Sequence, residues 1–282
     1  MTLCRNFTSK LFLQPIIYPE SDRVTYFVAQ DEVTKALHNG IPEVILPDVE
    51  QYKNAPKIAV LLTRDKHPDR EKPDYSMPLS IVEAITLSGG CPCFMIYENI
   101  EDQLEIIKPD GIFLPGGDFA LPKEWLEGTP AHAENPLRAE AYLACLNYAQ
   151  KHKLPLLGVC AGEQMLAGFC GCKITKVENH RGIVKEFAHD INLTKESLLH
   201  KITGLNQAQV NSNHSEAVSL KNLGDVIVSA TSNDGVTEAI EPKNPWNPFV
   251  IGIQSHPEYF VKTGDAFAVR LFQSFIEACK NV

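Results

Sequence analysis

The sequence contains no apolar run that approaches the roughly 20 residues a helix needs to span a bilayer. It also has no cluster of Lys and Arg. Its 26 basic residues are outnumbered by 35 acidic ones, which gives a formal net charge of -9. Because a nucleic-acid surface depends on gathered positive charge, we expect neither a nucleic-acid nor a membrane partner. The remaining composition, 44% hydrophobic and 22% charged, is typical of a globular protein with a sizeable core.

A disulfide framework is also missing. The eight cysteines follow no repeating spacing, which favours free thiols in a reducing compartment. Two C-x-C pairs, at 91–93 and 170–172, suggest zinc, but structural zinc sites typically use C-x2-4-C. The N-terminus has basic and no acidic residues but lacks a long apolar core. We expect a cytoplasmic protein, with a transit or secretion signal as the alternative.

The chain is predicted to divide near residue 55. Residues 1–55 hold four prolines around one predicted helix, which Asp31 would begin and Gly40 would end. We expect this segment to be an N-terminal extension packed across the main domain, or alternatively a docking surface for a partner. Residues 56–282 alternate apolar runs with helical patterns, as expected of one α/β domain.

Within this domain, the pattern predicts where each element lies. Strands are expected at 58–63, 93–97, 111–114, 154–159, 226–230, 237–240 and 249–254. Helices are expected at 79–87, 100–108 and 265–279, and also from Pro136, with an apolar stripe that starts at Leu137. Residues 64–76 are polar and contain two prolines, which predicts a loop.

The stretch 156–164, LLGVCAGEQ, carries the strongest chemical signal. The apolar residues before Cys160 predict a buried strand, and a helical pattern resumes at Gln164, so Cys160 lies on an abrupt turn between two glycines. This is the arrangement of a nucleophile elbow with Cys in place of Ser. A helix N-terminus favours both a thiolate and an oxyanion. The alternative is a small apolar Cys packed beside a tight turn.

Two other predicted strands also end in suggestive turns. Gly116 and Gly117 follow the strand 111–114, where amides unobstructed by side chains could face an oxyanion, although such a pair is often only a turn. His256 follows the strand 249–254. If that strand runs parallel to the elbow strand, His256 and Cys160 share one edge of the sheet.

Three motifs therefore occur in a definite order: PGGD at 115–118, GVCAGEQ at 158–164 and GIQSHPE at 252–258. In this order they resemble the class I glutamine amidotransferase-like proteins, from about Lys57 to the C-terminus. The stretches 89–92, 210–214 and 233–241 are most similar to gamma-glutamyl-gamma-aminobutyrate hydrolases and gamma-glutamyl peptidases. The resemblance implies an α/β three-layer sandwich with a mostly parallel, flavodoxin-like central sheet. It also implies hydrolysis of a small gamma-glutamyl compound.

The resemblance further implies a Cys-His-Glu triad. Cys160 matches the nucleophile, His256 the general base, and Glu258 the residue that orients the imidazole. The backbone amides of Gly117 and Ala161 match the oxyanion hole. The residues that match the substrate-binding positions are Gly116, Gln164, Asn211, Ser212 and His214.

Several positions depart from the family pattern. Ala161 stands where the hydrolases commonly have Arg, Ser255 stands where they have Trp, and Ser215-Glu216 replaces His-Gln. The missing cation and the nearby Glu163 make a thiolate less favoured, which leaves the particular substrate open. We expect most of the remaining histidines of the 173–225 segment to lie on the surface.

Hydrolysis through a thioester needs no metal and no organic cofactor. Two alternatives remain from the sequence. The chain could be a glutaminase subunit that delivers ammonia to a separate synthetase docked at residues 1–55, or a non-catalytic binding protein on the same fold. A homodimer is compatible with either function.

Overall fold

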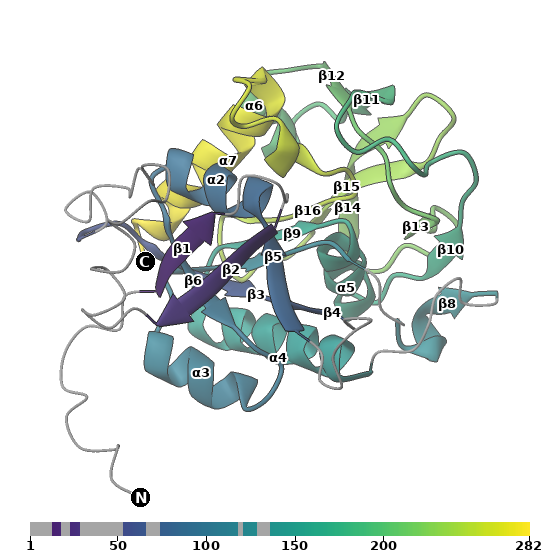
Figure 1. Cartoon of the computed structure of the whole chain (residues 1–282). Helices are drawn as coiled ribbons and strands as arrows, with labels where there is room; N and C mark the ends of the chain where they lie inside the picture. Colours follow the sequence, from purple (N-terminus) through teal and green to yellow (C-terminus); the bar gives the residue numbers. More distant parts are fainter. Residues whose placement is uncertain (1–12, 18–22, 29–52, 66–73, 118–120, 129–135) are drawn as a thin grey trace, which may run out of the picture.

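A computed structural model describes residues 13–17, 23–28, 53–65, 74–117, 121–128 and 136–282. A large sheet lies at its centre (Figure 1). Its mutually parallel strands are β3 (Lys57–Leu61), β6 (Cys91–Met95), β7 (Gly111–Leu114), β9 (Leu156–Val159) and β16 (Val250–Ile253). Its antiparallel strands are β11 (His189–Leu193), β12 (Gln207–Val210), β14 (Val226–Ser232) and β15 (Thr237–Pro242). The order across the sheet is β12-β11-β14-β15-β16-β9-β7-β3-β6.

Helices cover both faces of this sheet and complete three layers. They are α2 (Leu79–Leu87), α3 (Ile100–Ile107), α4 (Pro136–His152), α5 (Ala161–Phe169), α6 (Leu198–Thr203) and α7 (Ala266–Cys279). Because successive strand residues face opposite ways, Ile58 and Val60 join the apolar cluster of α2 and α7, whereas Ala59 and Leu61 join that of α3, α4 and α5. Figure 1 shows α3 and α4 below the sheet and α2 and α7 above it. The expected α/β three-layer fold is confirmed.

Two smaller sheets flank the central one. The first has the order β1-β2-β5-β4, and the second has the order β13-β10-β8. Their strands are β1 (Leu13–Ile17), β2 (Arg23–Val28), β4 (Thr63–Asp65), β5 (Asp74–Pro78), β8 (Leu126–Glu127), β10 (Ile174–Lys176) and β13 (Glu216–Val218). The expected loop at 64–76 is therefore wrong at both ends, because Arg64 and Asp65 pair with Tyr75 and Asp74 through their backbones despite polar side chains. The helix predicted between Asp31 and Gly40 lies outside the described residues.

The predicted elements agree most closely with the observed ones around the site. The helix 79–87 and the strand 111–114 have the predicted bounds. The elbow helix α5 begins at Ala161, three residues earlier than the apolar periodicity indicated. The Gln164 amide already donates to the Cys160 carbonyl at 3.1 Å, so the first helical turn starts directly after Cys160.

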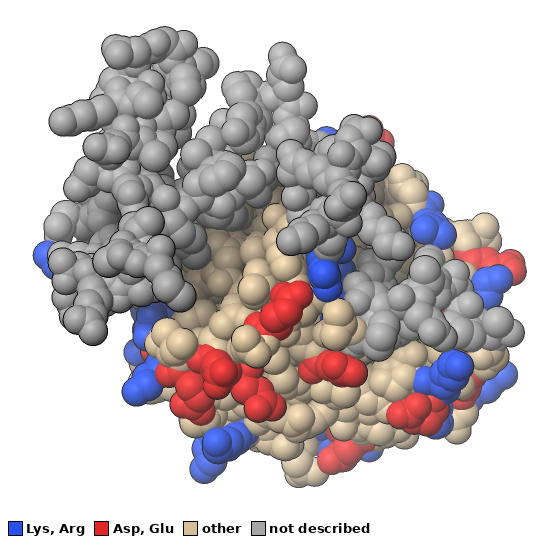
Figure 2. Space-filling model, turned by 60° about the horizontal axis from the view of Figure 1, so that its bottom comes forward, with Lys and Arg blue, Asp and Glu red and all other residues tan. Residues whose placement is uncertain are grey.

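The neighbouring strands β16, β9 and β7 bring the three motifs to one place. All three run parallel, so their carboxyl ends meet at the same edge, where α/β proteins commonly bind ligands. On the face shown in Figure 2, Lys and Arg are interspersed with Asp and Glu instead of gathering into one basic surface. In the part of the chain that the structure describes, no helix has the length and apolar character needed to cross a bilayer.

Candidate active site

Cys160 sits at the sharp turn between β9 and α5. Its φ of 52° and ψ of -106° place it in a region that residues with side chains rarely occupy. The turn is held from the neighbouring strand, since the Cys160 amide donates to the Ile253 carbonyl at 2.7 Å. The side chain is 8% exposed. The predicted elbow geometry is thus present, with the reactive sulfur at the N-terminus of α5.

His256 follows β16 and faces the same edge as Cys160. Its Nδ1 lies 2.7 Å from Glu258 Oε1, and the Glu258 side chain is only 2% exposed. Glu258 reaches this position because residues 257–259 form a short 3-10 helix instead of continuing the strand. The carboxylate fixes the imidazole with Nδ1 toward Glu258 and leaves the other nitrogen for Cys160.

The pKa of His256 lies well above its ordinary value of 6.5. Burial by itself lowers this pKa, but the negative charges of Glu258 and the Cys160 thiolate, together with hydrogen bonds to both, outweigh it. The raised pKa favours the imidazolium form of His256. This is the protonation state that can later give a proton to a leaving group.

The turn after β7 lies against both residues. A Cβ placed on Gly116 would come within 2.5 Å of His256 Cε1 and 3.2 Å of Cys160 Cβ, so only glycine leaves room for this approach. Gly117 has a φ of +136°, which also favours glycine. Gly116 is therefore brought to the Cys160–His256 pair, and Gly117 directly follows it. Asp118, the last residue of the PGGD motif, lies outside the described residues.

Arg138 is a buried residue of this turn that the sequence reasoning missed. Its guanidinium is 1% exposed, and Nη2 donates to the Gly116 carbonyl at 2.6 Å and contacts Tyr142 Oη at 2.9 Å. Tyr142 in turn donates to the Pro115 carbonyl. Together the two side chains hold the turn that carries Gly117.

Arg138 also places a positive charge near the nucleophile. Burial lowers its pKa, but Tyr142, Tyr97 and Cys160 reverse the direction and raise it. Arg138 therefore brings a buried positive charge from α4 to the turn that carries Gly117. The predicted stripe placed Leu137 in the core, whereas Leu137 is 47% exposed and Arg138 is buried in its place. A basic residue directly beside the apolar stripe was the available signal.

Two of the predicted substrate-binding residues contact the site directly or support it. Gln164 is 6% exposed, and its Nε2 donates to the Glu216 carbonyl at 2.8 Å and to Gln254 Oε1 at 3.1 Å. Asn211 accepts from the His256 amide at 2.7 Å and donates to the His256 carbonyl at 3.1 Å. Asn211 therefore positions the backbone of the catalytic candidate His256.

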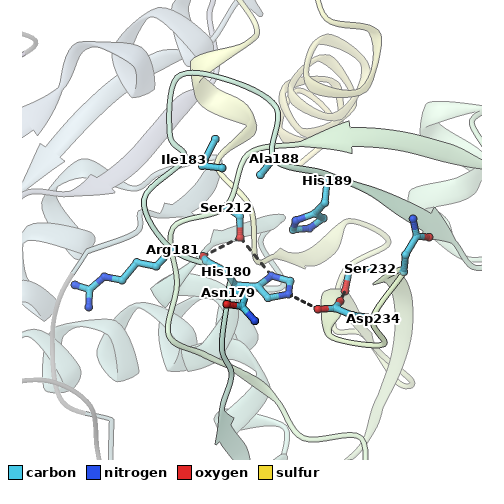
Figure 3. A pocket seen from close by; sticks show the side chains of 10 residues that line it. Asn179, His180, Arg181, Ile183, Ala188, His189, Ser212, Ser232 and Asp234 are labelled. Atoms are coloured by element: carbon cyan, nitrogen blue, oxygen red, sulfur yellow. Dashed lines mark hydrogen bonds and ion pairs between the residues drawn. The ribbon is translucent and has the colours of Figure 1, made fainter.

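Ser212 and His214 lie elsewhere, in a group of histidines around Glu238. Figure 3 shows Ser212 beside His180, one of these histidines. Ser212 Oγ donates to the His180 carbonyl at 2.8 Å, and His214 Nε2 lies 3.7 Å from Glu238 Oε1. His180 and His214 are 3% and 5% exposed, so the expectation that most of these histidines lie on the surface is wrong for both. The reason is that both histidines face the carboxylate of Glu238, which is buried in β15.

Glu163 is the other charged residue near the elbow. It is fully buried in α5, and neither carboxyl oxygen has a hydrogen-bond partner among the described residues. Burial, followed by the charges of Glu238 and Cys160, raises its pKa well above 4.5. The raised pKa favours the neutral form of Glu163 beside the thiol.

The model of the Peptidase C26 family matches residues 56–258 of this sequence. The chain belongs to the Peptidase C26 family. Family membership indicates a class I glutamine amidotransferase-like hydrolase fold and, in general terms, a cysteine-dependent amide hydrolase. The match covers the elbow, the turn after β7 and the His256–Glu258 segment.

Individual relatives agree with this family. A Schizosaccharomyces pombe protein named "Putative glutamine amidotransferase PB2B2.05" is 31% identical over 212 residues, 71% of this chain and 81% of its own length. A glutamine-hydrolyzing GMP synthase subunit from Sulfurisphaera tokodaii is 30% identical, over 48% of this chain and 66% of that protein. The fold is also similar to that of the solved glutaminase domain of Trypanosoma brucei CTPS with bound acivicin. The structural alignment covers 80% of this chain and 94% of that domain, with 17% sequence identity and a TM-score of 0.57. Because the sequence identity is only 17%, this structural similarity shows the fold alone.

Proposed function

We propose that this protein hydrolyses the gamma-glutamyl amide bond of a small gamma-glutamyl compound. Cys160 is the nucleophile, His256 the general base and acid, and Glu258 the residue that orients the imidazole. The observation that carries the proposal is the 2.7 Å contact between His256 Nδ1 and Glu258, beside an elbow cysteine that hydrogen-bonds to the same imidazole. The nucleophile, base and orienting acid are thereby in mutual reach.

The chemistry follows from this arrangement. With the Cys160 proton held by His256, the thiolate attacks the side-chain carbonyl carbon of the glutamyl group. The amides of Gly117 and Ala161 donate to the oxyanion that forms. The carbon–nitrogen bond then breaks, and His256 returns its proton to the departing amine. Water, deprotonated by the same imidazole, attacks the thioester and releases glutamate and the free thiol.

Glutamate release from a panel of substrates tests this proposal. The panel contains glutamine, gamma-glutamyl-aminobutyrate and gamma-glutamyl peptides, each assayed with wild type, Cys160→Ala and the control Cys170→Ala. We expect Cys160→Ala to lose at least about a hundredfold in rate. Cys170 lies at the far end of α5, so its variant should retain the wild-type rate. Full activity in Cys160→Ala would overturn the proposal.

A second candidate is a glutaminase that supplies ammonia to a separate synthetase. The similarity to the glutamine-hydrolyzing GMP synthase subunit favours it. This function predicts weak glutamine hydrolysis by the isolated chain and stimulation by the partner, with residues 1–55 as the proposed docking surface. Glutaminase activity that stays unchanged when candidate synthetases are added, and when residues 1–55 are removed, would exclude it in favour of the free-standing hydrolase.

A further inference from the structure

A second group of chemically capable side chains surrounds Glu238, outside the proposed catalytic set. His180 precedes β11, His189 begins it, His214 lies between β12 and β13, and Glu238 belongs to β15. His180 and His189 line a cavity of about 220 Å³, and Figure 3 shows their rings near each other on its wall. The proposed hydrolysis uses none of these four side chains.

The distances within this group lie close to those of a metal site. Glu238 Oε1 lies 3.3 Å from His180 Nδ1, 3.0 Å from His189 Nε2 and 3.7 Å from His214 Nε2. In a tetrahedral site with metal–ligand bonds of about 2.0–2.2 Å, ligand atoms lie roughly 3.3–3.6 Å apart. One ligand atom from each of His180, His189 and Glu238 also lies within 4.8 Å of the others.

The surroundings of His180 support the same conclusion. While Nδ1 faces Glu238, its Nε2 lies 3.0 Å from Asp234 Oδ2. Histidine ligands almost always donate their second ring N–H to a carboxylate or carbonyl, which fixes the tautomer. Ser232 Oγ in turn donates to the other oxygen of Asp234. Asp234 therefore already occupies the place of the carboxylate that would orient a metal-bound His180.

Two buried polar atoms of the group remain without a hydrogen-bond partner among the described residues. They are Glu238 Oε2 and His214 Nε2, on side chains that are each 1% exposed. Such atoms cost free energy unless a ligand satisfies them. Imidazole nitrogens with one carboxylate select zinc-class transition metals over calcium or magnesium, which prefer oxygen ligands.

We propose that His180, His189 and Glu238 bind one divalent transition-metal ion of the zinc class, with His214 as the fourth ligand. None of these ligands takes part in the proposed hydrolysis, so the ion does not change the expectation that hydrolysis needs no metal. It would instead fix the segment from Asn211 to His214. Ser212 is bonded to the His180 carbonyl, and its neighbour Asn211 holds the backbone of His256.

Metal binding is tested on the full chain with any affinity tag removed. A Cys160→Ala background prevents the ion from binding the proposed nucleophile, and the readout is independent of enzymatic activity. After metal removal, the protein is titrated with Co²⁺ and then with Zn²⁺, and metal content and visible absorption are measured. We expect one equivalent per chain, with the absorption of a four-coordinate Co²⁺ site and no thiolate-to-metal band. A thiolate band or no stoichiometric binding would overturn the assignment.

Variants separate this site from other metal-binding groups. His189→Ala should lower the affinity at least about tenfold, because it removes a ligand, and His189 is 22% exposed so that the fold should tolerate the change. Asp234→Asn, at an outer residue that is 57% exposed, should lower it about 10- to 100-fold. His152→Ala, a histidine on α4, is the matched control and should bind like the parent. Equal affinity in all three variants would show that the ion binds elsewhere.

Discussion

At the scale of single residues, the proposed chemistry depends on what is absent as well as on what is present. Cys160 and His256 approach each other across a turn with no side chain at Gly116. Arg138, which comes from another helix, donates to the Gly116 carbonyl and brings a buried positive charge to the same turn. Charge and space at the site are therefore set by residues far apart in the sequence.

Gly116→Ala should inactivate the enzyme without unfolding it. The new Cβ would come within 2.5 Å of His256 Cε1, and displacing the imidazole by about 1 Å can cost about a hundredfold in kcat. Steady-state kinetics and circular dichroism measure the two effects. Gly90→Ala is the control, since its Cβ would come within 2.6 Å of the flexible Ile276 in the core. Gly90→Ala should lower stability and keep kcat, and wild-type kcat in Gly116→Ala would contradict the proposed site.

Glu258→Gln should move the alkaline limb of the pH–rate profile to lower pH. The Glu258 carboxylate is one of the causes that raise the pKa of His256, so its neutral analogue lowers that pKa. The active form carries a protonated imidazole, which would then lose its proton at lower pH. We also expect kcat to fall at least about tenfold, because the imidazole is held less firmly. An alkaline limb at the same pH in both proteins would argue against Glu258 as the partner of His256.

At the scale of elements, the site is assembled by the ends of three neighbouring parallel strands. These strands were predictable, because their continuous apolar runs are typical of strands buried on both faces. The strands of the segment 173–225 could not be predicted in this way. Its strands are short and polar, as in β12, where only Val210 of four residues is buried, and they are held by pairings that link distant segments.

The same difference explains which site residues could be predicted. Cys160, His256 and Gly116 lie in turns directly after apolar strands, where the sequence itself marks the strand end. Arg138 reaches the site only through the tertiary packing of α4. The His180–Glu238 group needs four segments to meet, and nothing in the local pattern around Glu238 indicates this.

Asn211→Ala should weaken catalysis by releasing the segment after β16. Asn211 makes hydrogen bonds to the amide and carbonyl of His256 and to the carbonyl of Val184. Leaving buried backbone groups unpaired costs about 1–3 kcal/mol, so we expect kcat to fall roughly tenfold or more with a smaller change in KM. The exposed Asn213, whose side chain accepts from Gly182, provides the control Asn213→Ala. Equal kcat values for the two variants would remove Asn211 from the positioning machinery.

At the scale of the whole molecule, stability is linked to pH through a residue inside the fold. Glu163 lies between α5 and the sheet, where a Cβ on Gly252 would come within 2.6 Å of its Cγ. Its folded pKa is raised well above 4.5, so above that pH the folded chain keeps a proton that the unfolded chain loses. The free energy of unfolding then falls as the pH rises toward the folded pKa.

Glu163→Gln should remove this dependence. The stability gained over wild type is expected to grow with pH above 4.5, by at most about 1.4 kcal/mol per pH unit. Urea unfolding of both proteins at pH 5 and pH 8 measures the difference. Glu277→Gln, at a residue whose side chain is 66% exposed, is the control and should show no such growth. The same difference at both pH values for Glu163→Gln would mean that Glu163 is already ionised in the folded chain.

The central claim is that Cys160 forms a covalent gamma-glutamyl thioester. Rapid acid quenching during turnover of the best substrate, followed by mass spectrometry of the digested protein, tests it most directly. We predict a gamma-glutamyl adduct on the peptide that contains Cys160, formed at a rate sufficient for turnover and absent from Cys160→Ala. Turnover with the adduct on another residue, or with an adduct that forms too slowly to account for it, would contradict the claim.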